Sequence, residues 1–270
     1  MLIINADDFG RSRLATDRIL SCFRQGSVTS TSAMVFMEDS ARAAELAGEC
    51  GIDAGLHLNF TEKFTQSVHD ALFSNYHNRI AGFLTRNNYN LLIYHPALRK
   101  QFHYVCRVQF EEFKRLYGVS PSHVDGHHHM HLCANMLVEP IIPRGLKVRR
   151  NFSFSRGEKS LPNRLYRALV DRWLGRRYLT PDYLFSLPQC LKTGRLERAL
   201  GLAESSNVEL ETHPELTEEF EWLTGDACAV AISNLRKGSY AQLEASTRPG
   251  NNRRKALEAE EARCYRDSRS

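Results

Sequence analysis

The sequence predicts an α/β protein in which helices cover a parallel sheet. Short apolar segments of strand length alternate with longer amphipathic segments along the chain, in a βαβαβ pattern up to residue 58. Hydrophobic residues make up 42% of the 270 residues and charged residues 25%, which is typical of a globular protein with a sizeable core. This length fits one large α/β barrel or two smaller domains. Because we find no internal repeat and no linker, we predict a single domain.

The individual elements follow from local pattern. Residues 2–5 are an apolar run typical of a buried strand, and Ser12 can cap a helix over 14–23 that Gly26 ends. Residues 28–36, rich in Thr, Ser and Val, predict a second strand. We expect the later elements in this order: a helix at 40–50, a strand at 52–58, a helix at 105–117, a strand at 122–125, a helix at 132–142, a strand at 146–148, a helix at 161–174, a strand at 183–187, a helix at 195–205, a strand at 208–210 and helical segments up to about 237.

Residues 61–104 have weak periodicity and predict a loop or an insertion that shapes a substrate pocket. Aromatic side chains are frequent in this segment. They could stack on sugar rings, or most of them could form the core of an insertion, which we favour. The aromatic residues in question are Phe64, Phe73, Tyr76, Phe83, Tyr89 and Tyr94.

Three segments carry side chains suited to metal chemistry at predicted strand ends. Asp7 and Asp8 follow the first strand, His57 lies at the end of the third, and His127 follows a later one. In α/β barrels catalytic groups gather at the carboxyl ends of the strands. A catalytic metal takes about three protein ligands and leaves a position for water. Alone, the Asp pair is usually a turn and a single His is usually structural, but together the three segments predict a metal site with a second carboxylate free to act as a base.

These segments resemble the YdjC-like carbohydrate deacetylases, a family that includes the chitooligosaccharide deacetylases. The resemblance rests, in chain order, on residues 5–10 (Asn-Ala-Asp-Asp-Phe-Gly), 55–59 (Gly-Leu-His-Leu-Asn), 123–131 (His-Val-Asp-Gly-His-His-His-Met-His) and 212–214 (Thr-His-Pro). It implies a distorted (β/α) barrel of the glycoside hydrolase/deacetylase type, which we place over residues 1–246. Residues 247–270 are mostly polar and charged, and we expect a tail that is helical or disordered.

The resemblance also implies the roles of the site residues. Asp8, His57 and His127 are implied to bind a divalent metal, Mg²⁺ or Zn²⁺. Asp7 is implied to be the general base, and His213 to act near the leaving group. The implied reaction removes an N-acetyl group from an amino sugar, on a chito-oligosaccharide or a glycolipid head group, by attack of a water molecule bound to the metal.

Three further residues of the motifs are less clearly assigned. His129 and His131 are weaker candidates, which could orient the metal ligands. Glu215 stands after the His-Pro pair, where a small residue is common in the family. Two rival functions remain open at this stage. A glycosidase on a related barrel would need two carboxylates across a sugar and no metal, and a carbohydrate- or metal-binding protein would keep the site without turnover.

The charge of the chain is uneven, and this bears on its partners. Residues 144–177 contain eleven Lys or Arg but only two acidic residues, whereas the net charge of the whole chain is +5. Within 161–177, four apolar residues recur every four positions between arginines: Leu161, Leu165, Leu169 and Trp173. We favour a barrel helix that packs this stripe on the sheet with its arginines in solvent. The alternative is peripheral contact with an anionic membrane surface.

Other partners and the location follow from what the sequence lacks. We find no nucleic-acid motif, and a basic stretch alone is poor evidence for nucleic acid, so we expect none bound. A homodimer is compatible with the sequence. The first residues lack a charged leader, and the seven scattered cysteines form no Cys-x-x-Cys pair. We therefore expect a cytoplasmic protein with reduced thiols, or one peripheral to the inner surface of the membrane.

Overall fold

One parallel sheet organises the computed structural model, which describes residues 1–66, 70–154 and 157–244. Residues 245–270, including the predicted tail, lie outside this description. The strand order is β5-β4-β3-β2-β1-β7-β6, and every neighbouring pair runs parallel. The strands are β1 (Leu2–Phe9), β2 (Ser30–Ala33), β3 (Asp53–Leu58), β4 (His123–Gly126), β5 (Lys147–Val148), β6 (Tyr183–Ser186) and β7 (Val208–Thr212).

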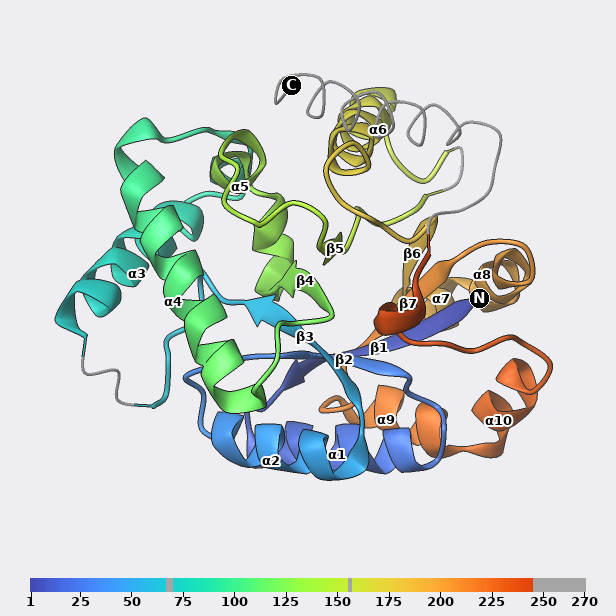
Figure 1. Cartoon of the computed structure of the whole chain (residues 1–270). Helices are drawn as coiled ribbons and strands as arrows, with labels where there is room; N and C mark the ends of the chain where they lie inside the picture. The colour runs from blue at the N-terminus through green and yellow to red at the C-terminus, as the bar shows by residue number, and fades with distance from the viewer. Residues whose placement is uncertain (67–69, 155–156, 245–270) are drawn as a thin grey trace, which may run out of the picture.

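Helices surround this sheet (Figure 1). The α-helices are α1 (Arg13–Arg24), α2 (Ser40–Cys50), α3 (Ala71–Leu84), α4 (Arg99–Tyr117), α5 (Ala134–Val138), α6 (Leu161–Leu174), α7 (Leu187–Thr193), α8 (Leu196–Ala203), α9 (Thr217–Thr224) and α10 (Asp226–Ile232). Short 3₁₀ segments are η1 (Asn90–Leu92), η2 (Pro96–Leu98), η3 (His127–Leu132) and η4 (Tyr240–Gln242). In the described chain no helix combines the length and apolar composition needed to cross a bilayer.

The sheet curls, so that its two edge strands approach each other. Past the end of β5, the N–H of Ser153 donates to the carbonyl of Leu184 in β6 at 2.8 Å. The N–H of Val148 likewise donates to the carbonyl of Leu179, just before β6, at 2.9 Å. These bonds bridge the edges of a half-barrel, so the predicted class, a distorted (β/α) barrel, is confirmed.

Along each strand, alternate side chains face opposite sides of the sheet, one apolar and one polar. Ile4 and Ala6 belong to the apolar core that the helices cover, whereas Asn5 and Asp7 point the other way, because successive residues of a strand face opposite sides. The same alternation puts polar residues at every second position of other strands. These buried residues include Ser30 and Ser32, His123 and Asp125, and Glu209 and Glu211. The interior of the half-barrel is therefore polar, and its site is built there.

The predicted ends of α1 are confirmed. The Ser12 hydroxyl accepts a hydrogen bond from the N–H of Ala15 at 3.1 Å, which satisfies one of the free donors of the first turn. Gly26 follows the helix with φ of 74°, a conformation that costs glycine little. This helix directly follows the strand that carries Asp7 and Asp8.

Several predicted boundaries need correction. The first strand reaches Phe9, so Asp7 and Asp8 lie inside the strand, near its carboxyl end, and not beyond it. Residues 61–104 are mostly helical, because α3, η1, η2 and the start of α4 fall there. Helix α5 covers only Ala134–Val138 of the expected 132–142, since 127–132 form η3, and α7 was not predicted. Of the aromatics in 61–104, Phe73 is a core residue while Tyr89 is exposed.

The favoured packing of α6 is wrong for three of the four residues of its apolar stripe. Leu161, Leu165 and Leu169 are exposed, at 64%, 57% and 68%, and do not pack on the sheet. Val170 and Leu174 are the residues that α6 buries. Trp173, the fourth residue of the stripe, is partly buried and packs against the core, so only the three leucines lie on the outer side of the helix.

Gly55 in β3 tests how tightly the interior is packed. A Cβ at this position would lie 2.3–2.5 Å from ring atoms of His123, which stacks on Tyr240 and has little room to move. We expect Gly55→Ala to lower the free energy of unfolding by about 1–3 kcal/mol or more. Gly48→Ala in α2 is the control: no atom lies within 4 Å, so it should raise stability by about 0.5–1 kcal/mol. Urea unfolding of both variants measures the difference; equal stability would contradict the packing argument.

Candidate functional site

The predicted metal-binding residues meet at the carboxyl ends of the strands. Potential ligand atoms of Asp8, His57 and His127 all lie within 4.8 Å of one another, and all three residues are buried. Oδ1 of Asp8 is 3.1 Å from Nδ1 of His127 and 3.4 Å from Nε2 of His57. Asp8 adopts φ of 68°, which is uncommon for a residue with a side chain and occurs here where the strand turns into the site.

The other ring nitrogen of each histidine has a carboxylate partner. His57 and Asp125 are register partners on β3 and β4, and their Nδ1 and Oδ1 atoms lie 2.8 Å apart. Nε2 of His127 lies 3.0 Å from Oε2 of Glu62, in the loop after β3. Carboxylates in these positions fix the tautomer and orientation of metal-binding histidines. Asp125 is itself held by the Ser32 hydroxyl, which donates to its Oδ2 at 2.7 Å.

Arg149, just past β5, connects the acidic residues of the interior. Its guanidinium donates to both oxygens of Asp7, at 2.5 and 2.6 Å, and lies 2.8 Å from Asp125. It also lies 2.7 Å from Glu209 and 3.7 Å from Glu211. This fully buried cation therefore faces four buried carboxylates, one fixed positive charge against four groups able to carry a negative one.

Because one arginine faces four buried carboxylates, the pKa values of these carboxyl groups shift in different directions. Burial, opposed by Arg149 and reinforced by the neighbouring Asp125, raises the pKa of Asp7 above its usual range. Burial likewise raises the pKa of Glu209 to about 7. For Asp125 the opposite holds: burial is outweighed by Arg149 and His57, which lower its pKa well below the usual value. Asp7 and Glu209 are therefore the members of this group that bind a proton most readily.

Histidine and aspartate pKa values also shift within the Asp8-His57-His127 cluster. Burial would raise the pKa of Asp8, but the hydrogen bond from His127 and the charge of His57 hold it well below its usual range. Burial would lower the pKa of His57, but Asp125 and Asp7 together raise it to about 9. The negative field of the site thus favours a cation at this position.

His213 follows β7 at the open side of the site. Its Nε2 lies 3.9 Å from Oδ2 of Asp7 and 4.0 Å from Oε1 of Glu211, and its side chain is 34% exposed. Burial would lower the pKa of His213, but the charges of Asp7 and Glu211 raise it. The N–H of His213 donates to Glu219 at 2.8 Å, which fixes the turn after the strand. The predicted pair Asp7 and His213 is therefore adjacent.

The weaker candidates His129 and His131 contact neither predicted metal-binding histidine through a hydrogen bond. Nε2 of His129 lies 3.3 Å from Oε1 of Glu211, and Nε2 of His131 lies 3.1 Å from the carbonyl of Arg149. His128 and His129 have φ of 53° and 56°, so the segment between the predicted strand at 122–125 and the predicted helix at 132–142 is neither extended nor a regular α-helix. The residues that orient His57 and His127 are Asp125 and Glu62 instead.

Glu215 has a specific environment, although the family commonly has a small residue there. Its Oε2 accepts from Arg11 at 2.8 Å and its Oε1 accepts from the Ser12 hydroxyl at 3.0 Å. Arg11 also donates to Glu62 at 3.1 Å. Glu215 thus joins the loop after β7 to the start of α1 and to the loop of Glu62, on the rim of the site.

A pocket of about 630 Å³ adjoins the site through His128 and His129. The η1 region and the start of α6 both contribute to its lining. The lining is mostly apolar and aromatic, and includes Tyr89, Leu92, Phe152, Pro162 and Tyr166. Tyr89, one of the aromatics considered for sugar stacking, is thus placed beside the site.

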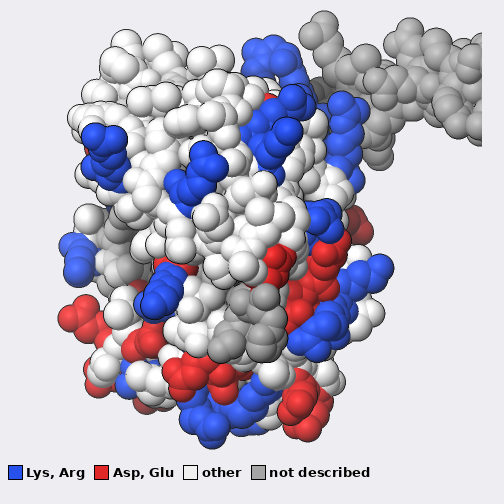
Figure 2. All heavy atoms as spheres, turned by 90° about the vertical axis from the view of Figure 1, so that its left-hand side faces the viewer, with Lys and Arg blue, Asp and Glu red and all other residues white. Residues whose placement is uncertain are grey.

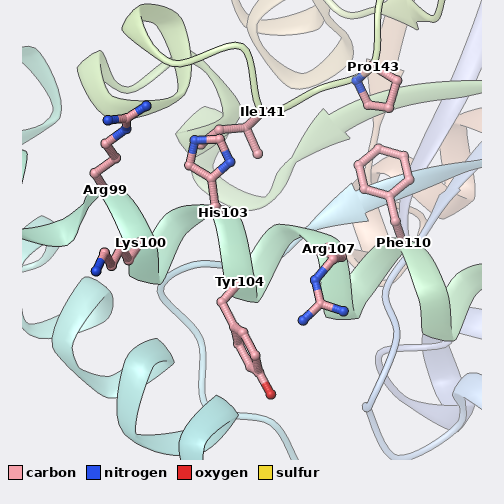
Figure 3. A pocket seen from close by; sticks show the side chains of 8 residues that line it. All are labelled: Arg99, Lys100, His103, Tyr104, Arg107, Phe110, Ile141 and Pro143. Atoms are coloured by element: carbon pink, nitrogen blue, oxygen red, sulfur yellow. The ribbon is translucent and has the colours of Figure 1, made fainter.

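A larger hollow of about 720 Å³ lies on the outer side of α4 (Figure 3). Basic side chains from α4 line it together with Ile141 and Pro143. Two of these basic groups are paired with acids, Arg99 with Glu139 at 2.9 Å and Arg107 with Glu111 at 2.9 Å. None of its lining residues belongs to the Asp-His cluster, so volume alone does not identify the site.

Fold and site together define a class: α/β barrel proteins that carry an Asp-His-His cluster and a neighbouring buried Asp at the carboxyl ends of their parallel strands. Within this class the chain belongs to the YdjC-like protein family, whose model matches residues 1–254. A solved structure from Enterococcus faecalis V583, provisionally described as a cellobiose-phosphate cleavage protein, has the same fold. It aligns with a TM-score of 0.62 and 22% identity over 90% of this chain and 98% of that one.

Curated relatives share part of the sequence. The chain is 31% identical over 173 residues to a protein from Proteus mirabilis named chitooligosaccharide deacetylase. It is 32% identical over 178 residues to a protein of the same name from Yersinia pestis. Each alignment covers 64% of this chain but only 61% and 62% of the relatives, so the match spans less than two thirds of their length.

Proposed function

We propose that the protein is a metal-dependent carbohydrate deacetylase that hydrolyses the N-acetyl group of an amino sugar, on a chito-oligosaccharide or a glycolipid head group. The observation that carries this proposal is the convergence of Asp8, His57 and His127 beside a second buried carboxylate, Asp7. The names of the curated relatives support deacetylation and, of the two substrates, the chito-oligosaccharide.

The residues present fit a divalent metal ion. One carboxylate and two imidazoles are a donor set typical of catalytic zinc sites, and a magnesium ion is also compatible with the carboxylate. The Nδ1 atom of His57 is engaged by Asp125, which leaves Nε2 directed at Asp8. When bound, such an ion polarises the acetyl carbonyl and lowers the pKa of water.

Asp7 is suited to take the proton of the attacking water. Arg149 holds both of its oxygens and Asn5 donates to Oδ1 at 2.9 Å, so the carboxylate has a fixed orientation. A positioned base of raised basicity is what amide hydrolysis requires, because water must be deprotonated as it attacks. Oδ2 of Asp7 lies 3.9 Å from Nε2 of His213.

His213 is suited to the second proton transfer. The amine of an amino sugar is a poor leaving group unless its nitrogen is protonated as the C–N bond breaks. Nε2 of His213 lies within 4 Å of both Asp7 and Glu211, two acidic groups that favour the protonated imidazole. The products are acetate and the free amino sugar, with Asp7 protonated and His213 neutral before both exchange protons with solvent.

Metal removal tests the proposal. We expect the chelator-treated protein to lose acetate release from N-acetylglucosamine oligomers and to regain it when Zn²⁺ or Mg²⁺ is added back. Acetate is measured directly and the sugar products are separated by chromatography. Chelator-insensitive cleavage of the glycosidic bond would instead identify the glycosidase. Bound metal without any acetate release across oligomers and glycolipids would leave only the non-catalytic binding protein.

Glu62→Gln tests the orientation of His127. Because Glu62 is the partner of Nε2 of His127, we expect this variant to bind metal about 10- to 100-fold more weakly. Glu215→Gln is a matched control, since Glu215 shares the Arg11 contact but does not touch His127. Calorimetric titration of the metal-free proteins with Zn²⁺ gives both affinities. Equal affinities of the two variants would contradict the role of Glu62.

A further inference from the structure

The outer face of α6 joins exposed leucines to unpaired arginines. Leu161, Leu165 and Leu169 lie along its first turns and are more than half exposed. On a helix of 3.6 residues per turn, Arg172 lies on the same side as the leucines, and the exposed Arg176 follows just after the helix ends at Leu174. We call these five residues the α6 face. No carboxylate of the described residues pairs with Arg172 or Arg176, whereas the nearby Asp171 is paired with Arg150 at 2.6 Å.

A second exposed apolar segment borders the same pocket as α6. Tyr89, Leu92 and Ile93 of the η1 region are 71%, 48% and 52% exposed. Tyr89 and Leu92 line the pocket beside His128 and His129, and Pro162 and Tyr166 from the start of α6 line it too. The pocket is therefore bounded by the two segments that carry these exposed apolar side chains. Exposed apolar surface gathered around a pocket marks an interaction site more often than scattered single residues do.

The charge around this region selects the kind of partner. Of the eleven Lys or Arg in residues 144–177, Arg149 is buried among carboxylates and Arg150 is paired with Asp171, whereas Lys159, Arg172 and Arg176 are exposed. Figure 2 shows the side of α3 and α4, where basic side chains are scattered over the upper part and acidic and basic ones mix lower down. A protein surface that presents leucines in one plane with arginines beside them is complementary to acyl chains under anionic head groups.

We propose that the α6 face docks on an anionic lipid surface and brings the mouth of the pocket beside His128 and His129 to that surface. The leucines enter the boundary of head groups and acyl chains, and Arg172 and Arg176 contact lipid phosphates. Tyr89, Leu92 and Ile93 form the second contact, at the same pocket. This docking does not depend on the proposed reaction, because it is measured without substrate.

Vesicle sedimentation of the full-length protein tests the proposal. We expect binding to vesicles of equal parts phosphatidylcholine and phosphatidylglycerol, and none to phosphatidylcholine alone. Binding should fall steeply when NaCl rises from about 0.05 M to about 0.5 M, because salt screens the arginines. Absence of binding to the anionic vesicles at low salt would overturn the proposal.

Paired variants locate the contact. Arg172→Gln with Arg176→Gln should weaken binding about 25-fold, at about fivefold for each basic residue near an anionic surface. Leu165→Ser with Leu169→Ser should weaken it by about tenfold or more. The controls are Arg13→Gln with Arg198→Gln, and Leu14→Ser, all exposed positions away from α6. Circular dichroism checks that each variant is folded.

Two results would reject the α6 face as the docking surface. Equal weakening by the control substitutions would show that binding follows net charge and not this face. A wild-type dimer that becomes a monomer in Leu165→Ser with Leu169→Ser, with vesicle binding unchanged, would assign the face to a second copy of the chain. Light scattering without vesicles distinguishes that outcome.

Discussion

Asp7→Asn is expected to lower the rate of acetate release by about 10²- to 10⁴-fold while metal affinity stays unchanged. The amide of Asn cannot accept the proton of the attacking water, but it keeps nearly the size and shape of the carboxylate. Arg149 would still face Asp125, Glu209 and Glu211, so its buried charge remains compensated. The measurement is turnover together with the metal content of the purified variant.

Asp53→Asn is the matched control for this result. Asp53 lies at the opposite end of the sheet, at the start of β3, where it accepts from the Ser30 hydroxyl at 2.8 Å. The substitution removes the same charge without touching the site, so turnover should stay near that of the unmodified protein. Wild-type turnover in Asp7→Asn would remove Asp7 from the role of base. Loss of metal together with turnover would move it to the metal ligands.

Arg149→Met is expected to lower the free energy of unfolding by about 3–5 kcal/mol. Removing one partner of a buried ion pair leaves the other without compensation, and here four buried carboxylates would share that loss. The variant can recover part of the free energy only by protonating these carboxylates. We therefore expect its stability deficit, measured by urea unfolding, to become smaller at acidic pH.

Arg150→Met provides the comparison at the next residue. Arg150 is paired with Asp171, but both side chains are partly exposed, at 23% and 18%, so water can replace much of the lost interaction. We expect a loss of about 1 kcal/mol. A similar loss in both variants would mean that the buried cluster contributes no more than a surface pair.

The sequence predicted the sheet and most of its helices because these depend on local pattern. The helix at 161–174 and the strand at 183–187 were predicted within one residue of their observed bounds. Predictions failed where tertiary contacts decide. Residues 127–132 form η3 because His128 and His129 adopt left-handed backbone conformations. In α6, the spacing of apolar residues does not reveal which side of the helix faces the sheet.

The candidate site was predicted in part, for a physical reason. Asp8, His57 and His127 end strands, so their meeting follows from the parallel sheet alone. Asp125 lies within the motif at residues 123–131, but the sequence did not reveal its partner. That partner is His57, which lies beside it in register on the neighbouring strand. The signal for the others was present as polar residues at every second position of apolar strands, as in Glu209-Leu210-Glu211. Nothing in the basic segment distinguished Arg149, the residue that becomes buried, from its exposed neighbours.

The left-handed backbone at Asp8 has a cost for any attempt to improve this protein. A residue with a side chain held at φ of 68° is strained by about 1–3 kcal/mol relative to glycine. Selection or design for heat resistance alone would therefore favour glycine at this position, and the more robust chain would lack the carboxylate. Engineering for thermal stability must therefore keep Asp8 unchanged and place its stabilising substitutions elsewhere, for example at Gly48.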